Sequence, residues 1–271
     1  MKNDGFKMNI NRLITIIDKE WNEVFRNKAV VFTVFFMPVL FTFLPLFMLY
    51  ITSSQLPAGG DTTDMPAIFA QTCGNLTANE CSQVFLANQF LVLFMIMPMT
   101  IPIAIAAYSV VGEKTTRSLE PLLATPVTTL ELLLGKCLSS SIPGVAAAWI
   151  CFLLFFVLMP LTGVSAGVRA SLTGPVWLGA VFLIGPLLSV FSVFFALTIS
   201  SRVSDPRTAE QISVVIILPL LGIIFGQMGG LLVIDQRLVW VSAIILAALD
   251  CLAAALAVRL FRRETILTKW K

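Results

Sequence analysis

The stretch GEKTTRSLEPLLATPVTTLELLLGK, residues 112–136, lies between two apolar runs that are each long enough to cross a lipid bilayer. A chain that only reverses direction between two spans needs a few polar residues, but this stretch has 25 residues and charges of both signs. Thr125-Pro126 interrupts it, because the residue before a proline avoids helical backbone angles. The pattern predicts two short helices on a surface that another molecule contacts.

The composition predicts a membrane protein. Of the 271 residues, 58% are hydrophobic and 12% are charged, and the mean hydropathy is +0.93, whereas ordinary soluble domains carry about 25% charged residues. The chain has no histidine, which removes the commonest metal ligand and general base. Residues 1–28 lack the apolar core and cleavage site of a signal peptide, so we predict no cleavable signal.

Six apolar runs have membrane-spanning length: 29–51, 90–111, 138–160, 176–199, 212–229 and 238–258. Backbone groups in lipid must hydrogen-bond within the protein, so the runs predict α-helices. We therefore expect an all-α membrane protein with six transmembrane helices, forming a single domain over residues 1–271. Kinks are expected at the prolines inside these runs: Pro38, Pro45, Pro98, Pro102, Pro143, Pro186 and Pro219.

Lysine and arginine counts predict the orientation, because cytoplasmic loops carry an excess of these residues. With the N-terminus in the cytoplasm, 16 of the 18 lie in the inside segments, which are 1–28, 112–136, 202–207 and 259–271. We expect both termini in the cytoplasm and a multi-pass protein of the plasma membrane.

The segment 8–28 predicts an amphipathic helix in the membrane interface, with Trp21 at the level of the lipid headgroups. Apolar residues recur at helical spacing, and charged residues, Glu20 among them, occupy the other side. Two interpretations stay open. The helix is either a general membrane-surface helix or a lever, joined to the first span at Asn27-Lys28, that also contacts a cytoplasmic partner.

The largest outside segment, 53–87, contains Cys73 and Cys81. The oxidising compartment makes them candidates for a disulfide, although their spacing does not establish the bond. Asn75-Leu76-Thr77 fits a glycosylation sequon, a triplet that is common by chance. Gly226, Gly229 and Gly230 loosen the helix near 227–237, and whether this stretch dips back into the membrane before the last span stays open.

Asp250 is the only carboxylate well inside a predicted span. A buried acid in a membrane is costly, which favours a functional role. The alternative is a neutral acid that hydrogen-bonds to a neighbouring helix, with Ser139, Ser140 and Tyr108 as candidate partners.

Within 112–136, Gly112 is expected to end the second span, and Thr128-x-x-Glu131 is a capping box that starts the next helix. Three strings together resemble the signature of ABC type-2 transporter permeases: GEK (112–114), RSLEPLLATPV (117–127) and LGK (134–136). Weaker similarities follow at 16–38, 200–207 and 260–264, so the resemblance covers nearly the whole chain. The cysteine-containing segment 53–87 is not a general feature of that family.

The resemblance implies a half-transporter that forms a homodimer or heterodimer and binds two cytoplasmic ABC ATPase subunits. The helix after the second span would be the coupling helix, seated in a groove of the ATPase. The residues carried over as ATPase contacts are Glu113, Arg117, Glu120, Leu122, Leu123, Thr125 and Pro126. Arg202 and Arg207 are carried over as secondary contacts.

No nucleotide site is expected in this chain. A P-loop needs G-x-x-x-x-G-K-[ST], but the one Gly-Lys pair, Gly135-Lys136, is followed by Cys137, and Leu130 stands where the first glycine belongs. We therefore predict a non-catalytic subunit without a cofactor of its own, with ATP and Mg²⁺ on a separate ATPase.

The expected function is the permease of an ATP-driven exporter. The chain has 21 phenylalanines, which favours a lipid-like or amphipathic substrate, and membrane lipids but no nucleic acid are expected as partners. An ion-motive secondary transporter would need more intramembrane charges and repeats, and an intramembrane enzyme would need a nucleophile–base pair or metal ligands. A non-transporting anchor or signalling subunit of an ABC complex also stays open.

Overall fold

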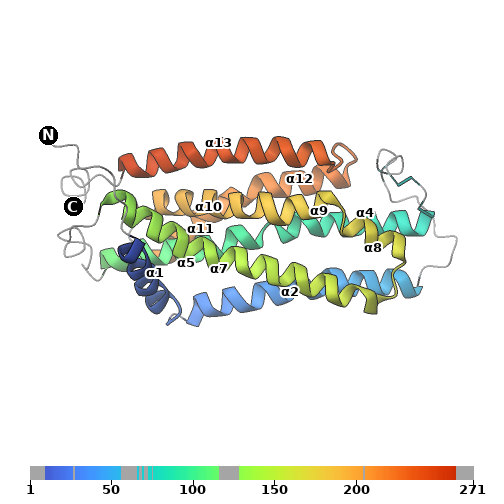
Figure 1. Ribbon diagram of the computed structural model, residues 1–271, viewed down its shortest axis with the longest axis horizontal. Coiled ribbons are helices and arrows are strands. Elements are labelled where there is room, and N and C mark those ends of the chain that lie inside the picture. Colours follow the sequence, from blue (N-terminus) through green and yellow to red (C-terminus); the bar gives the residue numbers. More distant parts are fainter. Residues whose placement is uncertain are drawn as a thin grey trace.

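The computed structural model describes residues 10–26, 28–55, 66, 69, 73–74, 76–115, 128–203 and 205–260. Over these residues the regular secondary structure is entirely helical, and six segments are long and apolar enough to cross a membrane. The long helices lie side by side in an elongated bundle (Figure 1). The structure confirms the predicted all-α class with six candidate spans.

Two spans are single helices and four are built from several pieces. The first span is α2 (Lys28–Gln55) and the sixth is α13 (Gln236–Leu260). The second joins α4 (Ala78–Phe94) to α5 (Met97–Thr115), and the third joins α7 (Thr129–Leu158) to η2 (Met159–Thr162). The fourth consists of α8 (Ala166–Leu172), α9 (Pro175–Gly179), η3 (Ala180–Ile184) and α10 (Gly185–Ser200). The fifth consists of α11 (Pro206–Ser213), η4 (Val214–Ile217) and α12 (Leu218–Met228).

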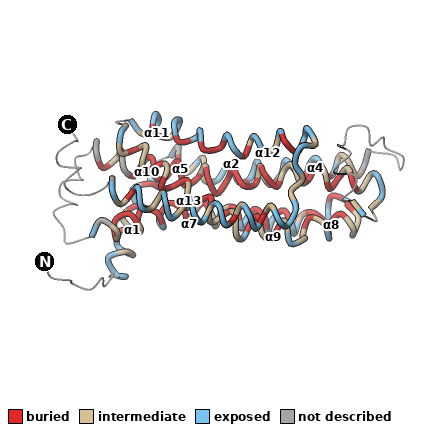
Figure 2. Tube along the Cα trace, turned by 90° about the horizontal axis from the view of Figure 1, so that it is seen from above, coloured by how far each residue is buried: buried red, intermediate tan, exposed pale blue. Residues whose placement is uncertain are grey.

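The second span forms the centre of the bundle. Its most apolar window is 78% buried, whereas that of the sixth span is only 11% buried. On α5 the side chains of Ile101, Ile103 and Ile105 are fully enclosed, and the helix packs against α10 and α7. Exposed positions recur along the outer sides of the other helices (Figure 2). Those outer positions are largely apolar, as a surface that meets lipid must be.

Irregular backbone in the second and fourth spans lies inside the bundle. The second span breaks at Met95 and Ile96, just before Pro98, because proline lacks the amide needed to continue the helical hydrogen bonds. A Cβ on Gly185, which follows the π-helix η3, would lie 3.8 Å from Pro98 Cγ. A Cβ on Gly144 would lie only 2.6 Å from Pro102 Cδ. Gly144 therefore lets the third span approach Pro102 of the second, whereas the contact at Gly185 leaves room for a Cβ.

Two boundaries differ from the sequence prediction, which leaves a third region open. The second span begins at Ala78 rather than at residue 90, so residues 78–87 of the predicted outside segment are helical. Gly112 does not end that span, because α5 continues to Thr115. Between α12 and α13 the chain makes a short turn, in which Gly230 has a φ of 69°. Residues 229–235 thus connect the two helices, and the rest of the stretch 227–237 belongs to α12 and α13.

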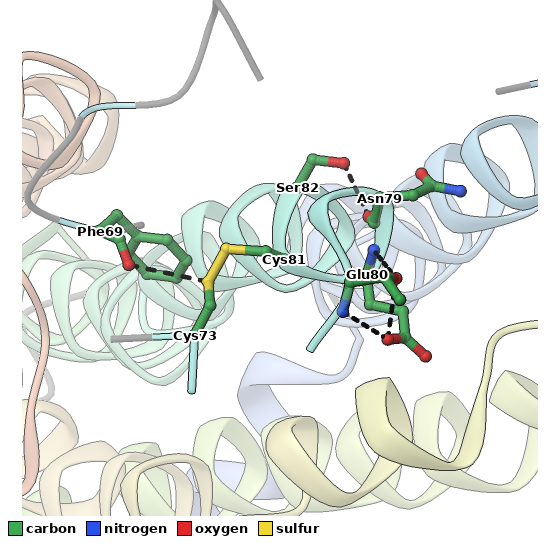
Figure 3. Close-up of a disulfide and its surroundings, with 7 residues drawn as sticks. Phe69, Cys73, Asn79, Glu80, Cys81 and Ser82 are labelled. Atoms are coloured by element: carbon green, nitrogen blue, oxygen red, sulfur yellow. Dashed lines mark hydrogen bonds between the residues drawn. A yellow bond between two sulfur atoms is a disulfide. The ribbon is translucent and has the colours of Figure 1, made fainter. Parts of the chain in front are cut away.

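The beginning of α4 is held in two ways. Thr77 caps the helix by accepting a hydrogen bond from the Glu80 amide, and the Glu80 carboxylate accepts one from the Thr77 amide at 2.9 Å. Cys73 and Cys81 form a disulfide that ties the preceding chain to the first turn of the helix (Figure 3). This end of α4 lies opposite the end of the bundle that carries α1 (Ile10–Val24) (Figure 1).

Candidate functional site

The N-terminal helix α1 crosses one end of the bundle at a steep angle to the long helices (Figure 1). It packs against α5 and α7. Its inward face consists of Ile16, Glu20 and Val24, which are four residues apart and all buried. Ile10 and Ile14 are exposed, which suits a helix whose second apolar face meets lipid.

Gly135 allows α1 to lie directly on α7. A Cβ atom on Gly135 would lie 2.6 Å from Cγ2 of Ile16, so any larger residue would push the two helices apart. One turn further along α7, the Trp21 indole donates a hydrogen bond to the backbone carbonyl of Ser139 at 2.8 Å. These two contacts set the position of α1 along α7.

Four charged side chains meet where α1, α5 and α7 converge, and we call Lys19, Glu20, Glu113 and Lys136 the ionic cluster. The Lys136 ammonium donates to Glu20 Oε1 at 2.8 Å and to Ser109 Oγ at 2.6 Å. It also lies 3.0 Å from Glu113 Oε2. The Lys19 ammonium donates to the other oxygen of Glu113, Oε1, at 2.6 Å. One lysine of α7 thus binds carboxylates of both α1 and α5.

The interior of the ionic cluster is shielded from water. Glu20, Glu113 and Lys136 are 1%, 3% and 2% exposed, and only Lys19, with 34% of its side chain exposed, reaches the surface. Buried charges are tolerated when opposite charges pair with them. Two cations face two carboxylates, so the cluster is neutral as a unit.

Glu20 is ionised at neutral pH. Burial by itself raises the pKa of its carboxyl, but the attraction of Lys136 and the hydrogen bonds from Lys136 and Ser109 outweigh burial and hold the pKa below the ordinary value of 4.5. Its second oxygen, Oε2, is buried without a hydrogen-bond partner among the described residues. Charge attraction to Lys136 is therefore the main stabilising interaction of Glu20.

The predicted capping box at the beginning of α7 is confirmed. The Glu131 amide donates to Thr128 Oγ1 at 3.2 Å, and the Thr128 amide donates to Glu131 Oε2 at 2.9 Å. Glu131 Oε2 also lies 3.9 Å from the Arg12 guanidinium. The first turn of α7 thus has its own charged contact with α1.

Of the residues predicted to contact an ATPase through 112–136, the structure describes Glu113. Its carboxylate points into the ionic cluster and is shielded from solvent, so the surface position expected from the sequence is not found. The other six lie outside the described residues: Arg117, Glu120, Leu122, Leu123, Thr125 and Pro126. The two helix ends that flank them, at Thr115 and Thr128, lie at the same end of the bundle as α1 (Figure 1).

Arg202 and Arg207 are exposed where α10 is connected to α11, at that same end (Figure 1). Asp205 caps α11 by accepting a hydrogen bond from the Thr208 amide at 2.9 Å. The hydrogen bonds from Thr208 hold the pKa of Asp205 below its usual range. Both arginines are accessible to a partner at this end of the bundle.

Asp250 lies on α13, and both of its carboxylate oxygens are buried without a hydrogen-bond partner among the described residues. Ser139 donates instead to the backbone carbonyl of Lys136, and the Ser140 hydroxyl also has no partner there. The hydrogen bonds suggested between Asp250 and these serines are not found. Within the described part of the chain, no group of three or more His, Cys, Asp or Glu side chains is placed to hold a metal ion.

Sequence reasoning missed the pairing of Glu20 with Lys136. It placed Glu20 on the polar side of the helix, yet the residues four before and four after it, Ile16 and Val24, are apolar and buried. That spacing is a signal for a buried acid. No local pattern links Glu20 to Lys136, because the two are 116 residues apart.

Comparison with known families gives a match to the family described as ABC-2 family transporter protein, over residues 14–236. The match includes the ionic cluster, both arginines of the α10–α11 connection and the first five spans. A comparison with curated proteins gave no match. Because the family match covers well over half of a six-span helical chain, the protein belongs to the ABC-2 transporter family.

Proposed function

We propose that this chain is the permease subunit of an ATP-driven exporter, in which a separate ATPase supplies the energy that moves a substrate outward. The observation that carries the proposal is the family match over residues 14–236 of a chain that has six apolar helices. Two copies of the permease, as a homodimer or heterodimer, would bind two ATPase subunits, with ATP and Mg²⁺ on the ATPases.

The proposed ATPase-docking surface is the end of the bundle that carries α1. The segment 116–127 joins α5 to α7 at that end, and Arg202 and Arg207 are exposed there (Figure 1). Lysine and arginine counts predict that this end faces the cytoplasm. A force on 116–127 would act directly on α5, the central helix of the bundle.

The proposed substrate is lipid-like or amphipathic. The outer face of α2 exposes a row of phenylalanines: Phe32, Phe35, Phe36, Phe43 and Phe47. Such a surface is suited to lipid tails or to the apolar part of a neighbouring molecule. A path between two copies that is lined in this way favours a substrate with a large apolar part.

Purification of the tagged full chain from its native membrane in mild detergent tests the proposal. We expect an ABC ATPase to co-purify and to hydrolyse ATP, with equal numbers of permease and ATPase chains by native mass spectrometry. Purification without any ATPase, under conditions that keep the permease monodisperse, would refute the proposed function.

Charge reversal locates the docking surface. Arg117→Glu and Glu120→Lys are expected to lower the amount of co-purified ATPase severalfold, because each places a like charge against its former partner. Arg169→Glu, an exposed charge reversal at the opposite end of the bundle, is the matched control and should leave the complex intact. Equal co-purification in all three variants would remove 116–127 as the docking segment.

A further inference from the structure

We infer that Lys136 is a positioning residue that binds α1 to both helix ends flanking the segment 116–127, so that α1 moves together with that segment. The inference rests on the proposed function for the role of 116–127 as the point of contact with the ATPase. The contacts themselves are a property of this chain alone.

The geometry gives Lys136 one partner on each neighbouring helix. Its ammonium lies 2.8 Å from Glu20 of α1 and 3.0 Å from Glu113 of α5. Glu113 is two residues before the end of α5 at Thr115, and Lys136 is the eighth residue of α7, which begins at Thr129. The ion pair between Lys136 and Glu113 thus joins α7 to α5, the helices on either side of residues 116–127. The ion pair between Lys136 and Glu20 joins α7 to α1.

A charged contact fixes position more sharply than an apolar contact does. Apolar side chains can slide past one another with little change in buried area, whereas the Lys136 ammonium must stay within hydrogen-bond distance of two carboxylates that water cannot reach. A displacement of α5 or α7 therefore carries α1 with it, or separates buried charges.

This arrangement assigns Glu113 a different role from the one expected from the sequence. Both of its oxygens are engaged by lysines, at 2.6 Å and 3.0 Å. Glu113 therefore contributes to coupling through Lys136 and Lys19 rather than by touching the ATPase.

The first test is amide hydrogen exchange of residues 10–24 in the full-length permease in lipid nanodiscs, without ATPase. In Lys136→Met we expect exchange in α1 to rise by at least about tenfold, because the helix loses its buried anchor. Glu23→Gln is the matched control, since it removes a surface carboxylate that also pairs with Lys19 and leaves Lys136 untouched. Wild-type exchange in Lys136→Met overturns the inference.

Lys136→Arg separates a charge contact from packing. Arginine keeps the cation and is expected to restore most of the protection of α1, whereas methionine matches the lysine stem without the charge. If methionine protects α1 as well as arginine does, the contact is one of packing and the inference fails.

Lys136→Met leaves two buried carboxylates unpaired and can prevent folding. The triple variant Glu20→Gln/Glu113→Gln/Lys136→Met removes the three buried charges together at nearly constant volume. We expect it to be monodisperse but to show fast exchange in α1. Wild-type protection in the triple variant overturns the inference.

The second test uses the complex with ATPase. In the wild type, trapping the nucleotide-bound state is expected to change exchange in α1 together with the end of α5, and the triple variant is expected to lose the change in α1 while binding the ATPase in normal amount. An unaltered α1 response in the triple variant overturns the inference. If the wild type binds no ATPase, the proposed function fails, while the nanodisc experiment still decides the role of Lys136.

Discussion

At the scale of single residues, the contact between α1 and the bundle depends on the charge of Glu20. A carboxyl whose pKa is lower in the folded protein stabilises it above the unfolded pKa, and this stabilisation is lost as the pH falls through the folded pKa. For Glu20 the ordinary value is 4.5, so the stabilisation is complete at neutral pH and decreases only in acid.

We therefore predict that acidification below about pH 4.5 weakens the wild type more than Glu20→Gln, which has no charge to lose at this position. The melting temperature of the detergent-solubilised protein, followed by circular dichroism from neutral pH into acid, measures the effect. If the melting temperatures of the two proteins fall equally as the pH is lowered, the charge of Glu20 does not contribute to stability.

Gly135 provides a second test at the residue scale. Gly135→Ala adds a Cβ that would lie 2.6 Å from Ile16, and we expect a loss of about 1 to 3 kcal/mol in stability from overpacking. Gly112→Ala is the matched control, because its Cβ would meet nothing within 4 Å. Adding Ile16→Ala to Gly135→Ala should recover part of the loss in melting temperature, and no recovery would contradict the contact.

At the scale of the helices, capping explains why α4 begins earlier than its apolar residues predict. Thr77 and Glu80 form the same S/T-x-x-E pattern that correctly predicted the start of α7. Apolar runs alone miss this part of the helix, because Asn88 and other polar residues occupy it. Asn88 is accommodated by accepting a hydrogen bond from the buried Trp177 indole at 3.0 Å.

The disulfide is expected to stabilise the first turn of α4. Cys73→Ser/Cys81→Ser should increase hydrogen exchange over residues 76–82 and lower stability by about 2 kcal/mol, because the preceding chain is no longer tied to the helix. Cys251→Ser, at an exposed free cysteine, is the control. Alkylation and mass spectrometry of the wild type with and without reductant should show Cys73 and Cys81 blocked until reduced, and free thiols would disprove the bond.

At the scale of the whole molecule, the described parts of the segments predicted to lie inside gather at one end of the bundle. The α10–α11 connection, α1, the end of α5 and the beginning of α7 share that end, and the beginning of α4 lies at the other (Figure 1). The lysine and arginine count uses only the sequence, whereas the helix arrangement comes from the structure. Both separate the described connections into the same two groups, one at each end of the bundle.

Thiol labelling tests which end faces the cytoplasm. In a background in which Cys137, Cys151 and Cys251 are replaced by alanine, a membrane-impermeant maleimide should label Ala170→Cys in intact cells. It should label Arg202→Cys only after permeabilisation, because the positive charges predict that this residue lies inside. Both positions are exposed. The reverse pattern would invert the topology.

The class of the fold was predictable because it depends on local properties. Runs of apolar residues determine helix number, and lipid permits no other backbone arrangement for them. Gly112 shows the limit of a local signal: α5 continues through it to Thr115, since Val111 and Glu113 on either side are buried and their packing outweighs the cost of a helical glycine. The capping residues Thr128 and Glu131 were read correctly, because both partners lie within one turn.

Residue types along the chain predicted a helical membrane protein with six candidate spans, lysines and arginines concentrated on one predicted side, and the family that the chain resembles. Each of these follows from residue types along a short window or from a string of adjacent residues. The enclosure of Glu113 and the contact between Glu20 and Lys136 depend on how the helices pack in three dimensions. The physical reason is that a buried ion pair forms between helices, so its partners are chosen by packing and not by their order in the chain.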